Sequence, residues 1–89
     1  MRTIHKQVLN SSGQSYICAP VTKILAVKVQ YGTPAIWYEI DDTLPVKSVI
    51  IYVVGTGHDM SFIPAGARYI DTVLMYNDSL VLHIYTVGD

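Results

Sequence analysis

The stretch VIIYVV (residues 49–54) decides the fold, because it is apolar at every position and ends abruptly in the polar turn GTGHD (55–59). Val, Ile and Tyr are typical of strands. A strand with one solvent-exposed face and one buried face would alternate polar and apolar residues. LVLHIY (80–85) is apolar on both faces in the same way. Both strands should therefore be covered on both sides, at least one of them by another copy of the chain.

Turn-forming residues divide the rest of the chain into short strands. The turns are NSSGQ (10–14), YGTPA (31–35), DDTLP (41–45), IPAGA (63–67) and YNDS (76–79), whose Asn, Asp, Gly, Pro and Ser favour turns. No stretch has a sustained helical period. The sequence predicts a single all-β domain over residues 1–89, a small antiparallel β-sandwich or barrel of about seven strands.

Alternation assigns faces to two of these strands. In LAVKVQY (25–31), Leu25, Val27, Val29 and Tyr31 should share one face, opposite Lys28 and Gln30. In IWYEI (36–40), Ile36, Tyr38 and Ile40 should share a face, opposite Trp37 and Glu39. Trp37 is then either an outward anchor for a base or a partner, or part of a two-sided core.

Composition limits the function classes. Of the 89 residues, 51% are hydrophobic and only 15% are charged, which is below the usual quarter. So much apolar side chain exceeds one small core and favours a homo-oligomer. The net charge of −1, with six Lys and Arg scattered along the chain, argues against nucleic-acid binding, which needs a basic face. Cys18 is the only cysteine, so no disulfide can form within the chain and an intracellular location fits. Because Cys18 follows Tyr16 and Ile17 in an apolar run, it is expected to be a small core residue.

The N-terminal MRTIHKQVL lacks the apolar run of a signal peptide. No apolar run approaches the roughly 20 residues of a membrane span. We therefore expect no membrane partner and a cytoplasmic location.

Three segments together resemble a family of short phage-encoded and prophage-encoded single-domain proteins of unknown function. They are ILAVKVQYGTPAIWYEID, the corner GTGH, and YIDTVLMYNDSLVLHIY. The resemblance implies a location in the host cytoplasm. Small phage proteins of this kind often inhibit host defences, some as sponges that bind a nucleotide immune signal, such as an ADP-ribose derivative, without cleaving it. By analogy the resemblance implies such an anti-defence role.

The corner Gly55-Thr56-Gly57-His58 has two interpretations. It lacks the Gly-Lys-Ser/Thr ending of a phosphate loop and the third glycine of a dinucleotide fingerprint. The two glycines would let a ligand approach the backbone, and successive N–H groups would form an anion nest. In the other interpretation the corner only ends the strand, and its polar residues bond their own backbone.

Catalysis is the weakest interpretation, because no polar residues form a supporting constellation. His58 and Asp59 are neighbours on the chain and should point apart. A zinc site of His5, His58 and His83 has no support from spacing. His83 lies between Leu82 and Ile84 and is more typical of a partly buried histidine with satisfied hydrogen bonds.

The function predicted is therefore non-catalytic binding of an anionic, nucleotide-like signal by a homo-oligomer, without metal or cofactor. The candidate ligand-binding residues are Tyr31, Trp37, Thr56, Gly57, His58, Arg68 and Tyr69. Arg68 would bind phosphate, or would pair with Asp71 or Glu39 at the surface. The alternatives are a protein-binding inhibitor of a host defence protein and a minor phage structural protein.

Overall fold

The chain is described over residues 1–89 by a computed structural model, and it is built from strands and turns alone. The seven strands are β1 (Arg2–Val8), β2 (Gly13–Ala19), β3 (Val21–Gln30), β4 (Thr33–Asp41), β5 (Lys47–Gly55), β6 (Arg68–Met75) and β7 (Leu80–Val87). No helix that could cross a membrane is present.

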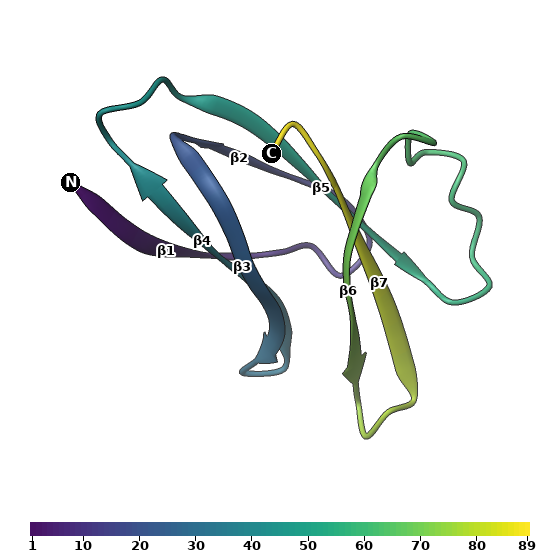
Figure 1. The fold of residues 1–89 in the computed structure, drawn as a ribbon. Helices are drawn as coiled ribbons and strands as arrows, with labels where there is room; N and C mark the ends of the chain where they lie inside the picture. The colour runs from purple at the N-terminus through teal and green to yellow at the C-terminus, as the bar shows by residue number, and fades with distance from the viewer.

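The strands form two antiparallel sheets that face each other (Figure 1). One sheet has the order β1-β4-β3, and the other has the order β2-β5-β7-β6. The molecule measures 41 × 29 × 15 Å, so its short dimension is that of two layers of strands. The predicted all-β sandwich with seven strands is confirmed.

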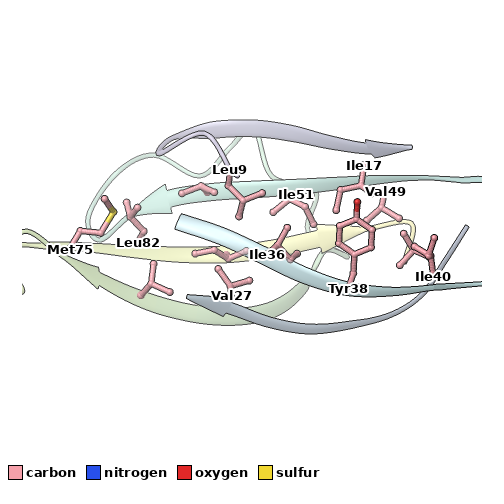
Figure 2. Packing of buried hydrophobic residues seen from close by; sticks show 14 residues of the cluster. Leu9, Ile17, Val27, Ile36, Tyr38, Ile40, Val49, Ile51, Met75 and Leu82 are labelled. Carbon is pink, nitrogen blue, oxygen red and sulfur yellow. The ribbon is translucent and has the colours of Figure 1, made fainter. Parts of the chain in front are cut away.

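The core lies between the sheets and is made by one face of β2 to β7, together with Leu9 just after β1 (Figure 2). The three-stranded sheet contributes residues of the predicted inward set, among them Val27, Ile36 and Tyr38. The four-stranded sheet contributes Ile51 and Ile84, which are both 0% exposed. Because side chains alternate along a strand, this core directs Trp37 and Glu39 to the outer face, and the structure thereby favours the outward one of the two interpretations that the sequence left open for Trp37.

The outer face of β5 is covered by the chain itself. Residues 56–67 leave the end of β5 and form a loop that projects from one side of the molecule (Figure 1). Ile63 from this loop packs with Tyr52 and Val54 in a second apolar cluster. Phe62 lies against Tyr52, with 6.2 Å between the ring centres. The cover expected for a doubly apolar strand is thus supplied here by a loop; cover by a second copy stays a prediction.

Three side-chain assignments were wrong. Leu25 lies at a bulge in the pairing of β3 with β4 and is 39% exposed. Tyr31 lies in the turn after β3, beyond the alternating stretch, and is 92% exposed. Cys18 is exposed because its neighbour Ile17 points into the core and Cys18 therefore lies on the outer face of β2, an edge strand.

Candidate functional site

The Gly-Thr-Gly-His corner is a tight turn that ends β5. The His58 N–H donates to the Gly55 carbonyl over 3.1 Å, and Gly57 has a φ of 81°. A positive φ at the third residue is what a type II turn requires, and glycine adopts it without strain. The Thr56 N–H donates to the Val81 carbonyl over 3.3 Å. Two amides of the expected anion nest, those of Thr56 and His58, therefore already have backbone acceptors.

Gly55 makes room for a side chain of the chain itself. A Cβ at this position would lie 2.8 Å from His58 Nδ1 and 2.9 Å from its Cε1, which is closer than such atoms approach. The His58 ring thus rests against the backbone of Gly55. The space that the glycine creates is filled by this imidazole, where the sequence suggested the approach of a ligand.

His83 lies in a chain of hydrogen bonds on the outer face of the four-stranded sheet. Its Nε2 lies 2.6 Å from Thr56 Oγ1 and its Nδ1 lies 3.0 Å from Thr72 Oγ1. Thr72 Oγ1 is also 2.6 Å from the Tyr69 hydroxyl. Both ring nitrogens therefore have partners, as expected for a satisfied, partly buried histidine. Thr72 is the member of this chain that the sequence did not indicate.

The corner and His83 border one shallow hollow of about 240 Å³. Thr56, Gly57 and His58 line it from the turn, and His83 and Tyr85 line it from β7. The structure thus brings together residues 25 or more positions apart. No lysine or arginine lines this hollow, so nothing with a permanent positive charge meets an anion there.

Arg68 and Tyr69 do not join this hollow directly. The guanidinium of Arg68 pairs with the Asp89 carboxylate, and neither Asp71 nor Glu39 is its partner. The Tyr69 ring packs edge-on against Tyr85 at 5.6 Å between ring centres. Tyr69 is therefore linked to this hollow through the Tyr85 ring and through the Thr72 hydroxyl, while Arg68 is engaged near the C-terminal end of the described chain.

Trp37 lies on the opposite side of the molecule, on the outer face of the β1-β4-β3 sheet. It is paired across the strands with Lys6 of β1 and Ala26 of β3, and paired residues share a face. Its side chain is partly exposed. The structure therefore separates Trp37 from His58, and one chain cannot use both for one small ligand.

The same outer face of the β1-β4-β3 sheet, called the Trp37 face below, holds most of the cations of the chain. In register with outward residues of β4 are Arg2, Lys6, Lys23 and Lys28, which are four of the six lysines and arginines. Two carboxylates, Glu39 and Asp41, share the face, so its formal charge is +2. The other two cations and five carboxylates give the rest of the chain −3. Cations that are scattered in sequence are thus concentrated in space, contrary to our inference from their spacing.

Tyr31 lies beside this Trp37 face, at the end of the β3–β4 hairpin. Tyr31 and Gly32 have φ angles of 53° and 73°, as in the type I′ turns that join two strands tightly. Lys6 Nζ lies 5.9 Å from the centre of the Tyr31 ring and donates to Gln30 Oε1 over 2.8 Å. Tyr31 and Trp37 are therefore the candidate residues that the structure places near cations.

The carboxylates of the Trp37 face are engaged within the chain. Arg2 lies 3.6 Å from Glu39. The pKa of the Asp41 carboxyl lies below its ordinary value, mainly because the Thr43 hydroxyl donates a hydrogen bond to it, and the Thr43 N–H adds a second. A shallow hollow of about 440 Å³ lies at this end of the face, lined by Arg2, Thr3, Ile4 and Glu39.

No three side chains among His, Cys, Asp and Glu come together as metal ligands. The three-histidine zinc site is therefore not formed. His5 instead packs edge-on against Tyr38, at 5.9 Å between ring centres, on the sheet opposite to His58 and His83.

Comparison with known families gives one match, which spans residues 1–89 and is described as a domain of unknown function (DUF7352). No curated protein and no solved structure matches the chain.

Proposed function

Because the chain belongs to the DUF7352 family, whose description assigns no activity, its function has to be argued from its own surface, and we propose that it is a non-catalytic binding protein for an anionic, nucleotide-like ligand. The ligand binds on the Trp37 face, with its base on the indole of Trp37 and its phosphate near Lys6. This location replaces the Gly-Thr-Gly-His corner as the binding site.

One observation carries the proposal: the only tryptophan of the chain points outward next to Lys6, on a face that holds four of the six cations. An indole ring gives a base a flat surface, and such stacking contributes about 1–3 kcal/mol per base in single-strand binders. Lysine attracts phosphate as a point charge. The corner hollow offers imidazoles and hydroxyls but no such charge.

The neighbours of Trp37 support the proposal that the ligand is bound without bond cleavage. Lys6, Ala26 and Glu39 surround the indole on the sheet, and Glu39 lies near Arg2. No nucleophile with an adjacent base is among them, and catalysis needs such a mutually supporting set. In the narrower form of the proposal, which the resemblance to phage-encoded proteins supports, the ligand is a nucleotide signal of a host immune system and the chain sequesters it.

The test is calorimetry of the intact chain with a panel of nucleotides that includes ADP-ribose derivatives. We expect Trp37→Ala to weaken binding about ten-fold to a hundred-fold, as the loss of one stacked base implies. Lys47→Gln is the matched control, because Lys47 lies off this face and bonds the Asp89 carbonyl. Ligand recovered intact after the complex is heated supports sequestration; a chemically altered product contradicts it.

A protein partner is the second candidate, and the apolar residues of β1 favour it. Ile4 and Val8 are each 57% exposed and lie on the same face as Trp37. Exposed apolar side chains that form a patch are typical of sites where another protein binds. A pull-down with the chain and with an Ile4→Ser, Val8→Ser variant separates the two candidates, because these changes should abolish capture of a protein and leave nucleotide affinity almost unchanged.

A further inference from the structure

We propose that the Trp37 face takes a short single strand of nucleic acid, with at least two phosphates bound, in preference to a mononucleotide. This inference rests on the function proposed above and specifies the class of ligand. The overall charge of −1 argued against any nucleic acid, but it averages over a face of +2 and a remainder of −3.

The positions of the cations carry the inference. Arg2 and Lys6 lie on β1 at one edge of the face, and Lys23 and Lys28 lie on β3 at the other edge. Strand geometry puts the two edges about 10 Å apart, and it separates the residues within each pair by roughly 13–16 Å along the strand. Trp37 lies on the central strand between them. The positive charge is thus spread around the indole in place of being gathered at one phosphate pocket.

A mononucleotide uses little of this arrangement. The ammonium of Lys6 reaches Gln30 on β3, so Lys6 and Lys28 lie toward the β3–β4 hairpin, whereas Arg2 and Lys23 are in register with Asp41 and Glu39 on the other side of Trp37. A mononucleotide with its base on Trp37 extends its phosphates in one direction only, so the cations at the far end stay without a partner. A nucleic-acid strand that runs along the face has a phosphate on each side of the stacked base, and cations at both ends can be neutralised; each such contact releases counterions and adds affinity.

The face also favours a single strand over a duplex. Bases within a duplex are stacked on one another and do not offer a free ring to an indole, whereas unpaired bases stack on aromatic side chains. Tyr31 provides a second ring at the end of the β3–β4 hairpin, 92% exposed and next to Lys6 Nζ. Trp37 and Tyr31 are therefore placed for two bases of one strand.

The experiment titrates labelled oligothymidylates of increasing length with the full chain at low salt and follows binding by fluorescence anisotropy. Thymidine monophosphate is the shortest ligand, and its affinity is measured by competition with a labelled oligothymidylate. We expect affinity to rise at least ten-fold from the monophosphate to the tetranucleotide and then to level off. The slope of log K against log salt should be about −0.7 for each phosphate contacted, and thus about −1.4 to −2 for two or three contacts. Lys6→Gln and Lys28→Gln should each reduce the slope by about 0.7.

Several results overturn the inference. If the monophosphate binds as tightly as the tetranucleotide, the ligand is a mononucleotide and only the function proposed above stands. If neither binds, both fail. Equal binding of a duplex, or equal competition by polyglutamate of the same charge, removes the role assigned to the bases. Trp37→Phe, which keeps a stacking ring, should keep most of the affinity that Trp37→Ala loses, and Lys47→Gln should keep all of it.

Discussion

His83 and Thr72 lie directly opposite each other on β7 and β6, with Nδ1 of the imidazole 3.0 Å from Oγ1 of the threonine. Through the second ring nitrogen the same histidine reaches Thr56 at 2.6 Å. One side chain thus ties the outer strand of the sheet to the first residue after β5. The apolar strand that contains His83 holds it in this position, and its two polar partners come from the turn after β5 and from β6.

The Thr72→Val variant should lose about 1–2 kcal/mol of unfolding free energy, because it removes the hydroxyl that serves both His83 and Tyr69, and a hydrogen bond contributes about 0.5–1.5 kcal/mol. Urea unfolding measures the loss. Tyr69→Phe is the matched variant: it removes only the bond between Tyr69 and Thr72, on a side chain that is half exposed. An equal loss in the two variants would show that the bond to His83 contributes nothing.

The Gly57→Ala variant should be destabilised by about 1 kcal/mol, because Gly57 has a φ of 81° and an alanine is strained in that conformation. Gly66→Ala is the control, since Gly66 lies in the same loop without a positive φ and has open space where a Cβ would be. Thermal unfolding of the two variants compares them. The interpretation of the corner as a type II turn predicts a lower melting temperature for Gly57→Ala alone.

Ile63→Ala should cost about 2 kcal/mol or more, because Ile63 is 7% exposed and its side chain covers Tyr52 and Val54. Pro64, its exposed neighbour, provides the control variant Pro64→Ala. Chemical unfolding followed at two protein concentrations gives the measurement. If a second copy covered this face in place of the loop, the midpoint would depend on concentration and Ile63→Ala would have little effect.

The pKa of Tyr38 is raised above its ordinary value by burial. The folded chain therefore favours the protonated phenol, and this contribution to stability is fully present below about pH 10, the ordinary tyrosine pKa. It is lost as the pH rises through the pKa of the folded state. The ultraviolet absorbance of tyrosinate should show one of the seven tyrosines ionising after the others. Tyr38→Phe should remove that last step; if the step persists, another tyrosine is the one perturbed.

The sequence indicated what depends on neighbours along the chain, and missed what depends on pairing. The alternation in residues 36–40 was enough to place Ile36 and Trp37 on opposite faces, because successive side chains on a strand point to opposite faces, but it did not decide whether the face of Trp37 is covered. That Lys6 lies beside Trp37 depends on the register of β1 against β4, which joins residues 31 positions apart. Periodicity holds no information on such a register.

Irregular positions account for the other differences. The bulge near Leu25 interrupts the period on which its inward assignment depended. The contact of His58 with Gly55 is made within a turn, where a glycine that accommodates a neighbouring ring looks the same in sequence as one that accommodates a ligand. Only the spatial grouping of Arg2, Lys23 and Lys28 with Trp37 identifies the basic face.

The charge around Trp37 can be tested without any ligand, because this residue is the only tryptophan and its fluorescence reports on its surroundings alone. Iodide should quench the emission about ten-fold more strongly than caesium at low salt, since one net positive charge about 6 Å away in water lowers the local free energy of the anion by about 0.7 kcal/mol and raises that of the cation by the same amount. At about 1 M salt, where the screening length falls to about 3 Å, the difference between the two ions should nearly vanish.

The double variant Lys6→Gln, Lys28→Gln should reduce the difference between iodide and caesium quenching at low salt. Lys47→Gln, which changes the net charge of the chain but not of this face, should leave the difference unchanged. Equal quenching by the two ions in the unmodified chain would mean that Glu39 and Asp41 cancel the cations near the indole, and the Trp37 face would then not attract phosphate.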